Sequence, residues 1–269
     1  NLSNHPCPNC GKQLMFEGLA QSGKKRWGCR GPRPERSYCY STTNPEGQKV
    51  RKRNGDAGFK IGRRNLKGKN RFLITAVQNA TPMHAGFLKA LESAANDLNA
   101  EILAVPIRYK NPTSRWTASQ ANEEVWADEV APYLYASRKY LNRRLVLLGD
   151  IKTQPTATSP LTGFEAITHG ESAILAHTKL QLKTVATPQN TLPKILTTTG
   201  ALTVPNYTDS KAGALGAFHH TLGACLVEVS GKVFHMRQIN ADKDAGSFTD
   251  LASVYSPGYV SAAPRALAL

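Results

Sequence analysis

The hydrophobic pattern changes at residue 72, and beyond that point it predicts alternating strands and helices. Residues 72–77 form an apolar run of strand length, and Thr81-Pro82 then supply an N-cap with proline at the first helical position. Apolar residues follow at spacings of three and four as far as Leu98, as in an amphipathic helix. Runs at 102–107 and 145–148 predict two more buried strands. This alternation is typical of an α/β body.

The later part of the chain is predicted to be mostly β. A helix over 120–135, broken at Pro132, precedes strands at 178–185 and 194–199. The clearest hairpin joins 222–229 to 232–239 through Ser230-Gly231, because glycine tolerates the positive φ of a two-residue turn. The predicted fold class is therefore mixed, α/β to α+β. It comprises a small N-terminal zinc ribbon, an α/β body with a mixed sheet, and a C-terminal β-hairpin.

Charge is concentrated in the first quarter of the chain. Residues 1–71 hold 17 Lys+Arg and 4 Asp+Glu, a net charge of +13, whereas the other 198 residues supply only +2 of the total of +15. A basic segment joined to a nearly neutral body indicates binding to a polyanion, most often nucleic acid. A basic tail that only keeps the protein in solution is the alternative.

Four of the five cysteines lie in the same quarter. Cys7, Cys10, Cys29 and Cys39 are predicted to bind one structural zinc ion, because Cys-x-x-Cys forms a tight turn that directs both thiolates to one metal. Nine residues separate the second pair instead of two, so His5 is a substitute candidate. A disulfide is the alternative, although a chain without a secretory signal usually stays reduced.

A basic arm at residues 48–71 follows the ribbon and is predicted to order on a phosphate backbone. Trp27, Tyr38 and Tyr40 lie among the ribbon's basic residues and either stack on bases or support the ribbon. The candidate nucleic-acid-binding residues are Lys24, Lys25, Arg26, Arg51, Lys52, Arg53, Arg63, Arg64, Lys67 and Lys69.

Candidate catalytic groups come from three places in the body. Asp150 ends a buried strand, where α/β sheets often place functional carboxylates, although a solvated loop aspartate is equally compatible. If the hairpin ladder extends beyond its ends, His219 lies opposite Asp242, and the two offer ligands for Mn²⁺ or Mg²⁺. Neither Gly-x-Gly-x-x-Gly after the first strand nor a Gly-x-x-x-x-Gly-Lys-Ser/Thr motif occurs, so nucleotide-cofactor binding lacks its usual support.

Several runs resemble a family of tailed-phage proteins. They are FLITAVQNATPMH (72–84), RYKNPTS (108–114), GDIKTQPT (149–156), TTG (198–200) with PNY (205–207), and FHH (218–220). In that family such a region precedes a metallophosphoesterase-type domain opened by Gly-Asp-x-His, and the resemblance implies pre-early degradation of host DNA. Asp150 lies in Gly-Asp-Ile-Lys without that histidine, and no Asp-x-His occurs, so no catalytic residue is carried over.

Three functions are compatible with these observations. The first is nucleic-acid binding, with DNA as the first candidate, in which the ribbon and arm hold phosphates while the body positions DNA or assembles a nuclease. The second is a metal-dependent nuclease whose active site lies in residues 72–256. The third is a phage transcription or replication regulator.

The expected organisation is a ribbon at 1–47, an arm at 48–71, a body at 72–256, and a linker or the start of a further domain at 257–269. A further domain after Leu269 is expected because the chain ends in an apolar run. We also expect homo-oligomers, no membrane segment, and a location in the cytoplasm of the infected bacterial host.

Overall fold

The computed structural model describes Leu66, residues 68–107 and residues 126–264 in full, together with the backbone of three strands nearer the N-terminus. The chain divides into two compact units, Asn1–Lys60 and Ile61–Leu269. In the first unit, β1 (Leu14–Leu19), β2 (Lys25–Cys29) and β3 (Ser41–Thr42) form an antiparallel sheet in the order β1-β2-β3. Among the predicted zinc ligands, Cys29 ends β2. Cys7, Cys10 and Cys39 lie outside the described residues.

A four-stranded mixed sheet forms the centre of the second unit. Its order is β12-β11-β4-β5, built from β4 (Arg71–Gln78), β5 (Glu101–Ile107), β11 (Gly223–Ser230) and β12 (Val233–Asn240). The parallel pair β4 and β5 is joined by helix α1 (Ala85–Leu98). The buried stripe of α1, which includes Phe87, Leu88 and Leu91, packs with side chains from one face of this sheet. The hydrophobic run at 72–77 therefore forms a strand covered on both faces.

A five-stranded mixed sheet packs on the other face. Its order is β6-β7-β8-β10-β9, and the central strands β7, β8 and β10 run parallel. The strands are β6 (Arg138–Asn142), β7 (Leu145–Leu148), β8 (Ser172–Leu175), β9 (Leu182–Val185) and β10 (Lys194–Thr198). One apolar core, which includes Leu103, Leu147 and Ile174, lies between the two sheets. The outer face of the five-stranded sheet packs against Leu161 and against Phe164, the first residue of the short helix α3 (Phe164–Ile167).

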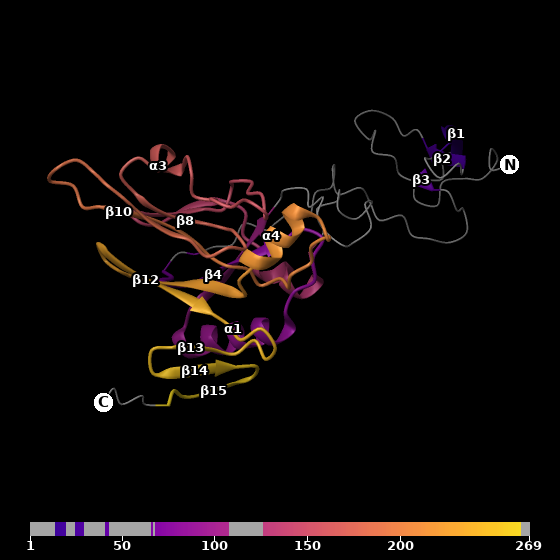
Figure 1. The fold of residues 1–269 in the computed structure, drawn as a ribbon. Coiled ribbons are helices and arrows are strands. Elements are labelled where there is room, and N and C mark those ends of the chain that lie inside the picture. Colours follow the sequence, from indigo (N-terminus) through magenta and orange to yellow (C-terminus); the bar gives the residue numbers. More distant parts are fainter. Residues whose placement is uncertain are drawn as a thin grey trace. The chain divides into compact units, whose positions relative to one another are not determined.

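The last strands form a third layer. Strands β13 (Phe248–Asp250), β14 (Ser253–Ser256) and β15 (Tyr259–Ala262) make an antiparallel meander beside α1, on the side away from the four-stranded sheet (Figure 1). Phe248 contacts Phe87 of α1 edge to face, at 6.0 Å between ring centroids. Strand β15 of this layer lies in the stretch 257–269, which the sequence assigned to a linker or to the start of a further domain. Among the described helices, none combines the length and apolar character that a bilayer crossing requires.

Several elements differ from the sequence-based expectations. Helix α1 begins at Ala85, and its N-cap is His84, whose Nδ1 accepts a hydrogen bond from the Phe87 N–H at 3.0 Å. Residues 81–82 instead lie in the loop before the helix. In the C-terminal hairpin Ser230 pairs with Val233, so the turn is Gly231-Lys232.

Two other elements differ from the prediction in the residues that the structure describes. Over the predicted helix at 120–135, the described part holds a 3-10 helix, η1 (Asp128–Tyr133). The strand expected at 178–185 begins only at Leu182, because residues 177–179 form hydrogen bonds with a neighbouring loop instead of extending the sheet.

Candidate functional site

Polar side chains gather where β4, β8 and β10 end. After β10 the chain crosses to the four-stranded sheet, since Ala76 N–H donates to Gly200 O at 3.1 Å and Leu202 N–H donates to Ala76 O at 2.8 Å. This crossing is tight: a Cβ added to Gly200, whose φ is +74°, would lie 3.0 Å from the Cα of Gly223. We call the side chains gathered at this edge the strand-end cluster, which comprises Gln78, His177, Thr178, Thr203, Tyr207 and His220.

Both histidines of the cluster use both ring nitrogens. The Nε2 atom of His220 lies 2.6 Å from the Thr203 carbonyl oxygen, which can only accept, so Nε2 carries the proton and Nδ1 accepts from the Tyr207 hydroxyl at 2.9 Å. In the same way, His177 donates from Nε2 to Gln154 O at 2.9 Å and accepts the Lys179 N–H at Nδ1. Burial lowers the pKa of each imidazole to about 4, so both rings are neutral at pH 7.

Gln78 is the exception in this hydrogen-bonded cluster. Its side chain is fully buried, and neither its Oε1 nor its Nε2 makes a well-formed hydrogen bond to the described residues. The amide nevertheless lies close enough to Tyr207 to act on its hydroxyl. Burial raises the pKa of Tyr207, and nearby Thr178 and Gln78 oppose that rise. The cluster thus contains one buried amide with unused hydrogen-bonding capacity.

The three predicted catalytic residues do not come together. Asp150 is exposed after β7, and its Oδ1 lies 3.2 Å from the Nε of Arg138. His219 ends helix α4 (Lys211–His219), where its ring lies against Phe218. Asp242 lies in the loop after β12. There it accepts the N–H groups of Asp244 and Ala245, and these bonds hold the pKa of its carboxyl below the usual value.

The expected pairing of His219 with Asp242 is therefore wrong. Strand β11 begins only at Gly223, opposite Asn240, and His219 is helical, so no ladder joins the two residues. Within the described ranges 68–107 and 126–264, no three His, Cys, Asp or Glu side chains are grouped closely enough to hold a metal ion. The strand-end cluster contains no carboxylate, and its imidazole nitrogens are already engaged. Its donor set does not fit Mn²⁺ or Mg²⁺, which prefer oxygen ligands, chiefly carboxylates and water.

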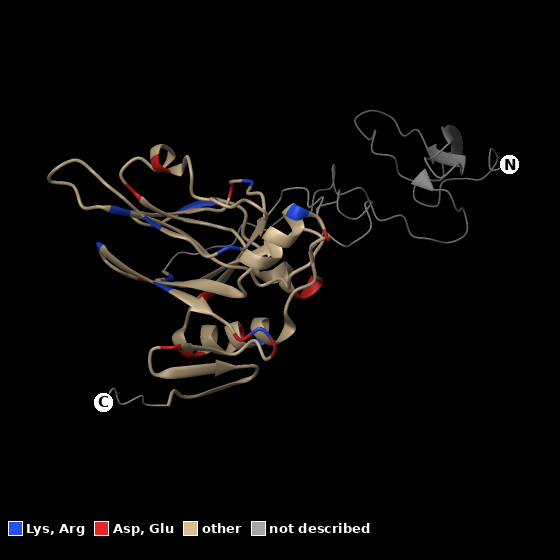
Figure 2. Ribbon diagram, in the orientation of Figure 1, with Lys and Arg blue, Asp and Glu red and all other residues tan. Residues whose placement is uncertain are grey.

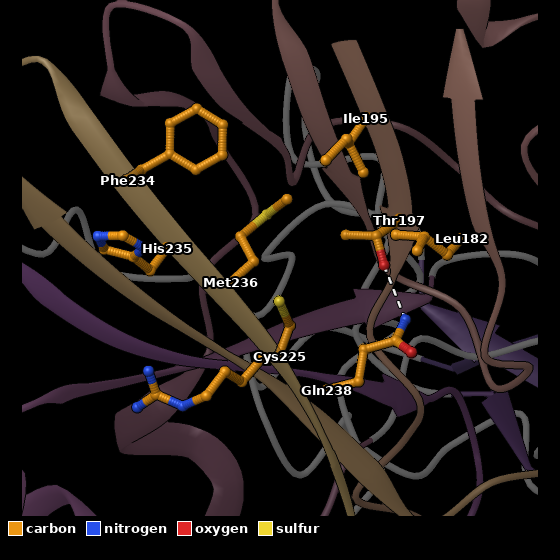
Figure 3. A pocket seen from close by; sticks show the side chains of 9 residues that line it. Leu182, Ile195, Thr197, Cys225, Phe234, His235, Met236 and Gln238 are labelled. Atoms are coloured by element: carbon orange, nitrogen blue, oxygen red, sulfur yellow. Dashed lines mark hydrogen bonds between the residues drawn. The ribbon is translucent and has the colours of Figure 1, made fainter. Parts of the chain in front are cut away.

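A groove of about 540 Å³ lies between β9 and β10 on one side and β11 and β12 on the other. Phe234, Met236 and Gln238 point from β12 toward β10, whereas His235 points away (Figure 3). Gln238 donates to Thr197 Oγ1 at 2.9 Å. Burial raises the pKa of the Cys225 thiol to about 12, so this lining residue is an unreactive thiol at neutral pH. The groove is thus mainly apolar.

Most of the predicted nucleic-acid-binding residues lie outside the fully described part of the chain. Lys25 and Arg26 lie in β2, of which only the backbone is described. The others fall outside the described residues: Lys24, Arg51, Lys52, Arg53, Arg63, Arg64 and Lys67. The side chain of Lys69 is described, and its Nζ forms an ion pair with Glu101 at 3.0 Å.

Sequence reasoning missed Gln78, Tyr207 and the paired roles of His177 and His220. A usable signal was present for two of them. Gln78 directly follows the apolar run at 72–77, and His177 directly follows the apolar run at 173–176. Polar residues at these points mark the carboxyl ends of buried strands, where α/β sheets place functional groups.

No known protein-family model matches the chain. The chain is 28% identical over 197 residues to Protein A1 of Escherichia phage T5, an alignment that covers 71% of this chain and 35% of the relative. The chain is therefore similar to a phage protein and spans about a third of its length. Among solved structures, Vps29 from Chaetomium thermophilum superposes over 72% of this chain and 100% of its own, with 12% identity and a TM-score of 0.32. That TM-score is too low to support a conclusion about fold or function.

Proposed function

We propose that this chain is part of a phage nuclease, to which residues 1–71 contribute nucleic-acid binding. The observation that carries the proposal is the charge separation, with +13 in residues 1–71 against +2 in the rest. Nucleic-acid phosphates release counterions when lysine and arginine neutralise them, and this release favours association with such a segment. The similarity to Protein A1 of Escherichia phage T5 and the resemblance to DNA-degradation proteins favour DNA as the target.

Hydrolysis of phosphodiesters within residues 72–256 is the second candidate function. The resemblance favours it, and the strand-end cluster occupies the edge at which α/β sheets commonly place reactive groups. The described residues of that edge do not fit a divalent metal ion. A regulator of phage transcription or replication remains a third proposal, which a defined sequence preference would favour. Each of these functions is proposed to operate in the cytoplasm of the infected host.

A combined gel-shift and plasmid-degradation assay tests these proposals together. The intact chain is incubated with plasmid DNA at low salt in the presence of EDTA, Mg²⁺ or Mn²⁺. Binding in EDTA without cutting in any metal supports a binding role for this part of the protein. Cutting that requires Mg²⁺ or Mn²⁺ would instead indicate that the nuclease active site lies in this chain. Absence of DNA binding would contradict the proposal.

A further inference from the structure

Two turns at one end of the second unit are held together by a single buried side chain. Asn142, which is 7% exposed, donates from Nδ2 to Gly231 O at 2.8 Å and accepts the Arg144 N–H at 3.0 Å. It thereby links the β6–β7 turn at residues 143–144 to the β11–β12 turn at residues 231–232. The two turns come from different sheets, and this contact fixes one against the other.

Three positively charged residues lie on these turns. Arg143, Arg144 and Lys232 are exposed, and none of them forms an ion pair within 4 Å in the described part of the chain. We call these residues the turn surface. Elsewhere on the body, acidic and basic residues are interspersed (Figure 2).

Nearby carboxylates are largely engaged with other cations. Glu228 accepts from both Arg71 and Arg237, and Glu101 pairs with Lys69. Glu171 precedes Ser172, whose N–H donates to Arg144 O, yet it forms no ion pair with the turn surface among the described residues. Among the described residues, the turn surface therefore has no carboxylate paired with it within 4 Å.

The turn surface adjoins the point at which the basic arm reaches the body. Val229 N–H donates to Asn70 O at 2.7 Å, and Glu228 pairs with Arg71 at the start of β4. The hairpin that carries Lys232 is therefore bonded to the last residues of the arm. Asn70 therefore lies opposite Val229, a few residues from Lys232 along the hairpin.

We propose that Arg143, Arg144 and Lys232 bind backbone phosphates of DNA and extend the nucleic-acid contact from the arm onto the body. The inference rests on the proposed function. Guanidinium groups match phosphate oxygens in bidentate geometry, and the Asn142 link holds the turns in place before binding, which lowers the ordering cost on association. The contact is to phosphates, so it adds affinity but no sequence preference.

The test compares two triple variants of the intact chain that carry the same change in net charge. One is R143Q/R144Q/K232Q, and the control is K152Q/K211Q/K243Q, which removes three exposed lysines from other loops and helix ends. Binding of a fluorescent DNA duplex is followed by anisotropy from about 50 to about 200 mM KCl. Three phosphate contacts should lower the log–log salt slope by about 2.7 in magnitude and weaken low-salt binding by on the order of 10-fold or more.

The control variant should retain nearly the wild-type slope. If the two variants bind DNA with the same affinity and salt slope while the wild-type chain still binds, the proposed role of the turn surface is overturned and the proposed function stands. Absence of DNA binding by the wild-type chain would overturn both. The thermal unfolding midpoints of the two variants are measured as a control. If they are equal, a difference in DNA binding does not come from loss of the fold.

Discussion

The Tyr207 hydroxyl donates a 2.9 Å hydrogen bond to Nδ1 of His220, across a buried edge to which four separate chain segments contribute. Because Nε2 of the same ring faces the Thr203 carbonyl oxygen, the imidazole is fixed as a neutral Nε2–H tautomer. His177 is held in the same state by Gln154 and Lys179. A cluster of this kind stabilises the fold only while its imidazoles stay unprotonated.

Stability should therefore fall as the pH drops from about 6.5 toward 4. The pKa of each of the two imidazoles is about 4 in the folded chain against 6.5 ordinarily, so between these values the unfolded chain binds protons that the folded chain does not. Each histidine makes its full contribution to the free energy of unfolding above pH 6.5. Below pH 4 that contribution has fallen by at most about 3 kcal/mol per histidine. Urea unfolding at pH 7.5, 6 and 5 tests this, because carboxylates titrate little in that range. A constant free energy of unfolding would contradict the neutral assignment.

Replacement of Gln78 by methionine should leave stability unchanged or raise it by about 1 kcal/mol. The amide is buried without a well-formed hydrogen bond, so its removal abolishes a desolvation cost and loses only the weak interaction with the Tyr207 hydroxyl. Thr75→Val on the same strand is the matched control, because Thr75 is equally buried but donates to Gly223 O at 2.7 Å, and its loss should cost about 1 kcal/mol. If Gln78→Met costs more than Thr75→Val, the amide has a partner such as an ordered water.

Lys194→Met should destabilise the body by about 3 kcal/mol. The Lys194 side chain is buried, and its ammonium donates to the carbonyl oxygens of Glu165 and His169 and to Thr168 Oγ1. Methionine fills similar volume but leaves these acceptors without a donor. Lys183→Met is the control, since that exposed lysine pairs with the Glu165 carboxylate at the surface and should matter much less. Chemical denaturation that gives equal losses for both variants would contradict the buried role of Lys194.

The five cysteines should become reactive in two steps if four of them bind zinc. Cys225 is buried with a pKa near 12, so a thiol reagent should not modify it in the folded chain. A zinc chelator should expose the thiols of Cys7, Cys10, Cys29 and Cys39, and denaturant should then expose the fifth. Metal analysis should give one zinc per chain. Cysteines that remain unreactive to chelator and reagent but react after reduction would indicate a disulfide instead.

Local sequence signals predicted the strands that are apolar over their whole length, since 72–77, 102–107 and 145–148 all lie within strands β4, β5 and β7. They were less accurate at boundaries. The hairpin turn was displaced because Gly231 takes the first central position, with φ +57°, whereas the prediction placed it second. Helix α4 was missed because its glycines Gly213 and Gly216 weaken the helical pattern, although Ser210 caps it by accepting the Gly213 N–H.

The strand-end cluster could not be predicted from local patterns. Gln78, His177, Tyr207 and His220 are spread over more than half of the chain, and they meet only because the segment after β10 crosses from one sheet to the other. The turn surface has the same origin, since Asn142 and Gly231 are 89 residues apart. The concentration of positive charge in residues 1–71, in contrast, can be counted from the sequence without knowledge of the fold.

The most direct test of nucleic-acid binding by the basic N-terminal quarter is the salt dependence of duplex DNA binding, compared between the intact chain and R51Q/K52Q/R53Q. For the intact chain, the logarithm of the association constant should fall linearly with the logarithm of salt concentration, by about 0.9 per phosphate neutralised. The variant should bind more weakly, with a slope smaller by about 2.7 if each of the three residues contacts one phosphate. Binding that is insensitive to salt, or identical in the two proteins, would contradict the proposed role of residues 1–71.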